Sequence, residues 1–176
     1  MTWPSSFDHN NGGRLTASVD ALGHRTTTSY TGCGQVSVVE DPLDRRTSYS
    51  YDGGRLIAVQ DARGHLTSYS YDGVGRRTVI LDARANRTTF VYHAVGQMTA
   101  LVDQLAQRTT YVYDVGGRRT RIEYSDGKRV TFSYDAADRR TKMEDSIGVT
   151  TYSYDELRPA QDSDLPGEQD RHLCLR

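Results

Sequence analysis

Short segments in which aromatic or threonine residues alternate with small polar or β-branched residues recur along the chain. Clear copies are T-S-Y-S-Y at 47–51, T-S-Y-S-Y at 67–71, and T-T-Y-V-Y at 109–113. A period of two places alternate side chains on opposite faces of a β-strand. Thr, Tyr, Phe and Val all suit a pleated surface. The pattern therefore predicts a strand at each copy.

A second, apolar segment follows each aromatic segment, as in R-L-I-A-V at 55–59 and Q-M-T-A-L-V at 97–102. Asp and Gly occupy the connections, for example D-G-V-G at 72–75 and D-A-R-G at 61–64. Asp side chains bond nearby backbone amides, and Gly permits positive φ. Connections this short join antiparallel neighbours, so each aromatic and apolar pair predicts a β-hairpin.

The sequence pattern of the hairpins repeats at a fixed period. Three series run in phase, each with steps of 20 or 21 residues where its members are consecutive. The second aromatic of each segment falls at Tyr30, Tyr51, Tyr71, Tyr92, Tyr113, Tyr134 and Tyr154. An acidic series runs through Asp20, Asp41, Asp61, Asp82, Asp103 and Asp145, with Tyr124 in the missing slot. A glycine series runs through Gly34, Gly54, Gly75, Gly96 and Gly117, with Asp138 as the exception. Registers locked in this way indicate an array of stacked repeats.

The sequence predicts an all-β fold, an antiparallel meander of repeated β-hairpins that forms a curved, partly rolled sheet. Residues 1–13 are interpreted as a partial first repeat and 14–155 as the array. Residues 156–176 show no alternation and are expected to be a disordered or out-of-pattern tail. The positions expected to be structural are Tyr30, Tyr49, Tyr51, Tyr69, Tyr71, Tyr92, Tyr111, Tyr113, Tyr134, Tyr154, Asp52, Asp72, Asp114, Gly54, Gly75, Gly96 and Gly117.

Composition narrows the classes of function. The 176 residues carry a net charge of -1, so no overall field attracts nucleic acid or an anionic membrane, and neither is an expected partner. The 12 tyrosines indicate a core built from aromatic rather than aliphatic side chains. No apolar run is long enough to span a bilayer, and no signal peptide is visible. Cys33 and Cys174 lie far apart in unlike contexts, which favours two free thiols over a disulfide.

The text Y-S-Y-D-G-G-R-L at 49–56 and Y-S-Y-D-G-V-G-R at 69–76 resembles the RHS (rearrangement hotspot) and YD-repeat family. The resemblance covers about residues 7–155. It implies a β-sheet that spirals into a large hollow shell. In bacterial members the shell encloses a toxin, and in animal relatives it belongs to a cell-surface adhesion protein. A secreted or cell-surface location is implied in the same way. Thr31 and His93 depart from the family pattern at the Asp position, and Arg77, Arg119 and Arg140 depart from it at the Leu position.

Three readings of function follow. The first is a non-catalytic structural segment of a bacterial toxin-type shell, with the rest of the shell or its enclosed toxin as partner. The second is a carbohydrate-binding surface module, in which exposed rings at Tyr49, Tyr69 and Tyr111 stack on sugars. The third is a truncated gene fragment without independent function.

Catalytic, metal and cofactor sites are not expected. The five histidines show no metal-ligand spacing, and the sequence contains no C-x-x-C or H-E-x-x-H cluster. No G-x-S-x-G or P-loop occurs, and the glycine pairs at 73–75 and 32–34 read as turns. The aspartates recur in like turns, whereas an acid and base pair needs unlike environments. The sequence therefore predicts a protein that is not an enzyme.

Overall fold

The computed structural model of the chain describes residues 5–155, 158–163 and 173–174. It divides into two units, Met1–Thr88 and Thr89–Arg176, and the boundary falls inside one strand, β9. The strands of the first unit are β1 (Ser6–His9), β2 (Leu15–Val19), β3 (Arg25–Tyr30), β4 (Val36–Glu40), β5 (Arg46–Asp52), β6 (Arg55–Gln60), β7 (Leu66–Tyr71) and β8 (Arg77–Leu81). Those that follow are β9 (Arg87–Tyr92), β10 (Met98–Val102), β11 (Arg108–Tyr113), β12 (Arg119–Glu123), β13 (Arg129–Tyr134), β14 (Arg140–Glu144), β15 (Val149–Asp155), β16 (Arg158–Ser163) and β17 (Leu173–Cys174).

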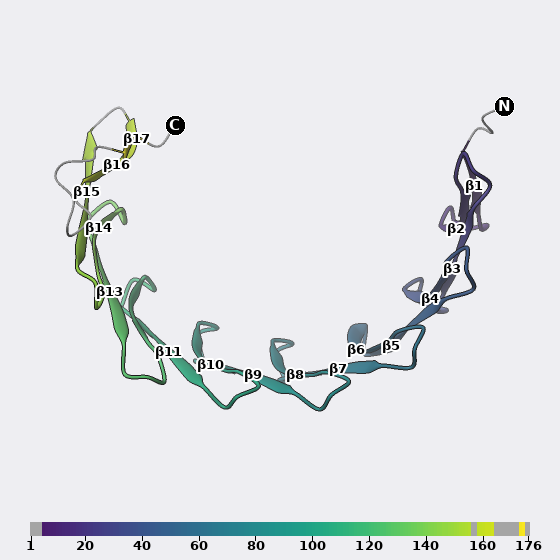
Figure 1. The fold of residues 1–176 in the computed structure, drawn as a ribbon, viewed down its shortest axis with the longest axis horizontal. Coiled ribbons are helices and arrows are strands. Elements are labelled where there is room, and N and C mark those ends of the chain that lie inside the picture. Colours follow the sequence, from purple (N-terminus) through teal and green to yellow (C-terminus); the bar gives the residue numbers. More distant parts are fainter. Residues whose placement is uncertain (1–4, 156–157, 164–172, 175–176) are drawn as a thin grey trace. The chain divides into compact units, whose positions relative to one another are not determined.

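Within each unit, every strand pairs antiparallel with the strand that follows it in the chain (Figure 1). Strand β6, for example, lies between β5 and β7, with Tyr49 opposite Val59 and Val59 opposite Thr67. The aromatic segments form the odd-numbered strands and the apolar segments form the even-numbered strands. The predicted class, an all-β meander of repeated hairpins, is confirmed.

A β-bulge in the second strand of most hairpins decides which side chains share a face. In β5–β6, Tyr51 lies opposite Leu56 and Ser50 lies opposite Ala58, so Ile57 is the extra residue. Leu56 and Val59, three positions apart, therefore both join the face that carries the tyrosines. We call this the aromatic face. The same shift follows the aromatic strands β3, β7, β11 and β13.

Very few side chains are buried in the described residues. Only Ala17, Ala100 and Thr150 fall in the buried class, and no large side chain is fully enclosed. From β3 to β13, the aromatic side chains of the strands are half-buried by their neighbours along the sheet. No second layer of described residues covers either face within a unit, so cross-strand contacts rather than an enclosed core hold the hairpins together.

In the predicted tail, the structure describes β16, which pairs with β15, and β17, which pairs with β16. The expectation of disorder at 156–176 did not include these strands. The remaining tail residues lie outside the described residues, so the tail boundary stays a prediction.

Candidate functional site

Two kinds of turn alternate along each unit. Hairpin turns follow the aromatic strands and begin at Asn10, Thr31, Asp52, Asp72, His93, Asp114 and Asp135. Linking turns join one hairpin to the next and begin at Asp20, Asp41, Asp61, Asp82, Asp103, Tyr124 and Asp145. In most of them the N–H of the first residue donates to the carbonyl of the fifth residue. The carbonyl of the first residue accepts a hydrogen bond from the N–H of the fourth residue. The two kinds therefore share one backbone design.

The acidic residue at the start of a turn caps its backbone. Oδ1 of Asp114 accepts the N–H groups of Gly116 at 3.0 Å and Arg118 at 2.9 Å. Asp72 caps the last hairpin turn of the first unit in the same way. These side chains satisfy turn amides that the strand ladder leaves without partners. Asn10 caps its turn in the same way, which shows that a neutral amide also serves.

Positive φ is required at the fourth residue of most turns. Gly75, Gly96 and Gly117 have φ of 89°, 95° and 82°. The turn that starts at Asp52 is one residue shorter, and both Gly53 and Gly54 have positive φ there. Two central residues with positive φ make a type I′ turn, and this accounts for the 20-residue step from Tyr51 to Tyr71.

The second tyrosine of each aromatic segment links neighbouring hairpins. The Tyr51 hydroxyl donates to the carbonyl of Val36 at 2.8 Å, and the Tyr113 hydroxyl donates to the carbonyl of Met98 at 2.8 Å. The acceptor is the first residue of the preceding strand, 15 positions upstream. It lies beyond the paired part of the ladder, which for β4–β5 reaches only Val38 and Ser48. Equivalent bonds are made by Tyr30, Tyr71, Tyr134 and Tyr154.

The long side chains at the ends of two hairpin turns, Gln35 and Arg118, reach the next hairpin turn. Gln35 Nε2 donates to the carbonyl of Gly54 at 2.8 Å. Arg118 bonds Asp114 in its own turn at 2.7 Å, then reaches the carbonyl of Asp135 at 3.2 Å and the carboxylate of Asp138 at 2.7 Å. Asp138 stands where other repeats have Gly, at φ 63°, and its carboxylate provides the acceptor.

These arms also limit the space at two of the hairpin-turn glycines. A methyl group at Gly34 would collide with the guanidinium of Arg14, and one at Gly117 would lie 3.0 Å from Nε2 of Gln97. Ala85 and Ala106 hold the corresponding positive-φ position in two linking turns, where such an arm is not observed. Gly34 and Gly117 therefore each meet two requirements, backbone conformation and space.

The carboxylates of both kinds of turn are stabilised in their charged form. The hydrogen bond from the Arg118 side chain, followed by that from its backbone N–H, lowers the pKa of Asp114. The Arg45 side chain is the largest cause of the lowered pKa of Asp41. The His24 backbone N–H is the largest cause of the lowered pKa of Asp20. A repeated pKa shift of one sign fits a capping role and differs from the split values of a general acid and base.

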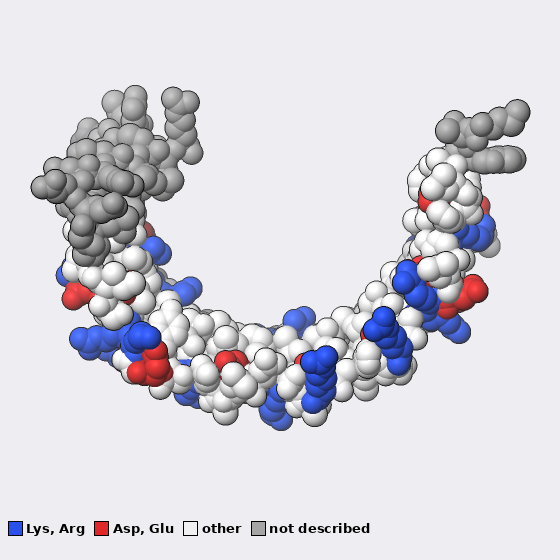
Figure 2. All heavy atoms as spheres, in the orientation of Figure 1, with Lys and Arg blue, Asp and Glu red and all other residues white. Residues whose placement is uncertain are grey.

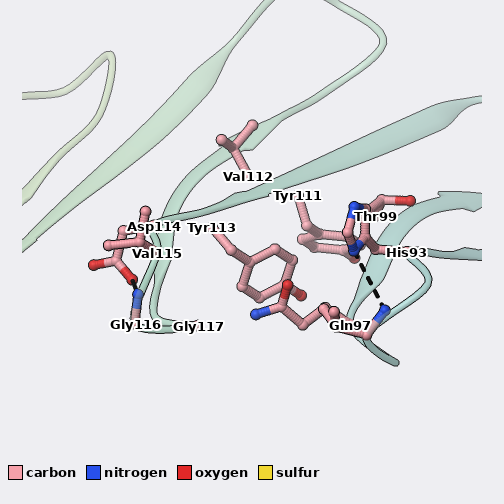
Figure 3. Close-up of a pocket in the computed structure, with 11 residues that line it drawn as sticks. His93, Gln97, Thr99, Tyr111, Val112, Tyr113, Asp114, Val115, Gly116 and Gly117 are labelled. Atoms are coloured by element: carbon pink, nitrogen blue, oxygen red, sulfur yellow. Dashed lines mark hydrogen bonds between the residues drawn. The ribbon is translucent and has the colours of Figure 1, made fainter.

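A hollow on the second unit lies between the hairpin turns at 93–97 and 114–118 (Figure 3). It has a volume of about 730 Å³ and is lined by Gln97, Thr99, Tyr111, Tyr113 and Asp114, among others. Figure 3 shows the Tyr111 and Tyr113 rings projecting to one side of β11 and Val112 to the other. Of the three rings proposed to stack on sugars, Tyr111 is thus placed beside an open hollow.

Arginine covers two of those three rings. The guanidinium carbon of Arg77 lies 4.7 Å from the Tyr69 ring centre, and that of Arg119 lies 5.2 Å from the Tyr111 ring centre. These distances are within the range of cation–π contacts. A sugar that stacked on either ring on the same side would have to displace the guanidinium.

Many charged side chains form ion pairs with residues close to them in the sequence. Figure 2 shows basic and acidic side chains beside one another on both units. The described residues contain no group of three or more His, Cys, Asp or Glu placed to hold a metal ion. They also contain no helix that is long and apolar enough to cross a membrane.

Comparison with known proteins identifies the repeats. A family model described as RHS Repeat matches residues 53–89, 92–129 and 113–146, more than half of the chain. The chain belongs to the RHS repeat family. No curated protein matches it.

Solved structures with the same fold are much longer than this RHS chain. The Photorhabdus luminescens Tc holotoxin pore matches over 84% of this chain and 9% of its own, with a TM-score of 0.69 and 15% identity. The TcdB2–TccC3 complex without its hypervariable C-terminal region matches over 94% of this chain and 13% of its own, with a TM-score of 0.58 and 14% identity. The RHS chain thus spans about a tenth of the proteins it resembles, and the likeness shows the fold.

The sequence pattern missed the links between RHS repeats. The bulge hides the alternation of the apolar segment, because residues three apart share a face. The recurring Arg or Gln after each turn glycine was visible, but its reach into the next turn depends on the offset between hairpins. The tyrosine hydroxyl bond left one signal in the sequence, the regular tyrosine at or next to the end of the odd-numbered strands from β3 to β15.

Proposed function

We propose that the chain is a non-catalytic structural segment, a run of RHS repeats that forms part of the wall of a larger, toxin-associated shell protein. Its partners would be further repeats of that shell or the component that the shell encloses. The observation that carries this proposal is the near absence of buried side chains: each hairpin obtains its contacts from the hairpins beside it.

The outer edge of β1, which among the described residues pairs only with β2, supports the proposal. All four residues of β1 are exposed, and Phe7 is 62% exposed. His9 occupies the slot that tyrosine fills one repeat later, at Tyr30. An exposed strand edge with the repeat sequence is a site where another strand of the same kind can pair and extend the sheet.

Extending the array tests the proposal. Two further copies of residues 66–86 would replace residues 1–3, which keeps the period in phase with β1. In the control, a Gly/Ser segment as long as the two added copies replaces residues 1–3. Because stacked repeats gain stability from each new interface, the extended array should unfold at higher urea than the control and self-associate less. Equal unfolding midpoints for the two chains would contradict the proposal.

Carbohydrate binding is the second candidate, and the hollow beside Tyr111 is the observation that favours it. Ring stacking combined with polar groups such as Gln97 and Asp114 is the chemistry that a sugar requires. A neutral sugar should then bind the native chain and lose binding in Tyr111→Ala but not in Tyr49→Ala, since Tyr111 lines this hollow and Tyr49 does not. Retained binding in Tyr111→Ala would remove this candidate.

A further inference from the structure

One position on the aromatic face changes its chemistry along the chain. It is the first residue after each hairpin turn, and in order it holds Leu15, Val36, Leu56, Arg77, Met98, Arg119 and Arg140. Four of these seven residues are apolar, so the fold accepts an apolar side chain there. The arginines are therefore not required by the repeat itself.

Arg119 and Arg140 line one hollow on the second unit. It has a volume of about 310 Å³, and its other lining residues are Tyr113, Gly117, Phe132 and Tyr134. The hollow lies across two hairpins, because Tyr113 pairs with Arg119 and Tyr134 pairs with Arg140. Three aromatic residues and two arginines thus line a single open space.

Both guanidinium groups are held on aromatic rings and lack an acidic partner. The guanidinium carbon of Arg140 lies 4.6 Å from the Phe132 ring centre, and that of Arg119 lies 5.2 Å from the Tyr111 ring centre. Among the described residues, no carboxylate lies within ion-pair distance of either. The nearby carboxylates of Asp114, Asp135 and Asp138 are taken up by Arg118 and Arg139.

Stacking on a ring leaves the edge of a guanidinium free. The N–H groups lie in that edge and match the oxygens of carboxylate, sulfate or phosphate. Packing against a ring also reduces the side-chain freedom that binding would otherwise remove. Both arginines are exposed, so a ligand can reach them.

From this arrangement we infer that the hollow between hairpins β11–β12 and β13–β14 binds an oxyanion carried on a ring. The oxyanion bonds Arg119 and Arg140, and the ring lies against the aromatic side chains. An aromatic acid and an acidic sugar share this chemistry. The site does not depend on the proposed shell function, because it uses residues of the second unit alone.

Titration of the full chain at low ionic strength tests the inference, with tyrosine ring NMR signals as the readout. The probes are phenyl phosphate for the aromatic source and glucuronate for the saccharide source, with phenol, glucose and inorganic phosphate as partial ligands. At least one ring-bearing oxyanion should bind saturably, at least about tenfold more tightly than any partial ligand. The tighter binder of the two shows whether the ring of the natural ligand is aromatic or a saccharide.

Two double variants separate the site from general charge. Arg119→Leu/Arg140→Leu should weaken binding at least about tenfold, because both guanidinium donors are lost. Arg121→Gln/Lys142→Gln alters the same two strands on the opposite face and should change the dissociation constant less than about twofold. Leucine already occupies the equivalent position at Leu15 and Leu56, and thermal melting would verify the fold. Arg119→Gln/Arg140→Gln gives the same test if the leucine pair is unstable.

Three results would overturn the inference. One is that neither ring-bearing oxyanion saturates. Another is equal binding by the native chain and the arginine double variant. The third is binding of inorganic phosphate as tight as that of the tighter ring-bearing oxyanion, since the rings would then contribute nothing.

Discussion

The hairpin turns and the linking turns share a backbone design but differ in what they contact. In a linking turn the polar contacts stay local: Asp20 bonds His24 at 2.9 Å and Asp82 bonds Asn86 at 2.8 Å. In a hairpin turn, Gln35 and Arg118 reach the following turn, and the tyrosine hydroxyl bonds the preceding hairpin. The contacts that hold one repeat to the next are thus concentrated at the hairpin-turn end of the sheet. The linking end serves mainly to reverse the chain.

Removing one tyrosine at the hairpin-turn end of the sheet and one at the linking end should give the largest difference in stability. Tyr113→Ala deletes a half-buried ring and the bond to the Met98 carbonyl, and we expect a loss of about 2 kcal/mol in the free energy of unfolding. Tyr124→Ala removes a ring from a linking turn, where it is 42% exposed, and should cost less than about 0.5 kcal/mol. Urea unfolding measures both. Similar losses would contradict the unequal roles of the two ends.

A matched pair of glycine substitutions sharpens the comparison. Gly23 and Gly34 have φ of 84° and 83°, so alanine meets the same backbone strain at either site, about 1 kcal/mol. Only Gly34 also faces an arm, the guanidinium of Arg14. We expect Gly34→Ala to destabilise the chain by about 1–2 kcal/mol and Gly23→Ala by about 1 kcal/mol. If the two variants unfold at the same urea concentration, the arm does not constrain the turn.

A fall in pH should destabilise both kinds of turn. Per site, we expect this effect to be smaller than those of the tyrosine and glycine substitutions. The pKa values of Asp114 and Asp41 are lower in the folded chain, so their stabilisation is present above the unfolded pKa of about 3.9. It is lost as the pH falls through the folded pKa. Asp114→Asn keeps an amide oxygen for the turn, as at Asn10, but removes the titrating group.

Urea midpoints between pH 7 and pH 2.5 measure this effect. The gap between the native chain and Asp114→Asn should narrow below about pH 4. Asp41→Asn should behave alike, because its carboxylate also bonds an arginine in its own turn. Parallel curves at all pH values would show that the charge of Asp114 adds nothing to the cap.

The repeats and the hairpins could be predicted because their signals are local. Alternation at 47–51 and the Asp and Gly of the turns depend on residues a few positions apart. The links could not be predicted in the same way. That Tyr51 bonds Val36, or that Arg118 bonds Asp138, follows from how one hairpin is offset against the next. The bulge at Ile57 also defeats a simple period-two reading, since Leu56 and Val59 then share a face.

The short span of the links has a consequence for how the chain acquires its structure. Tyrosine bonds join residues 14 or 15 positions apart, and the Arg118 arm spans 20. Contacts that are close in sequence require little loop closure before they form, and such chains fold quickly. Two adjacent hairpins hold a complete set of these links. Folding can therefore begin at any neighbouring pair and spread in both directions while later repeats are still being synthesised.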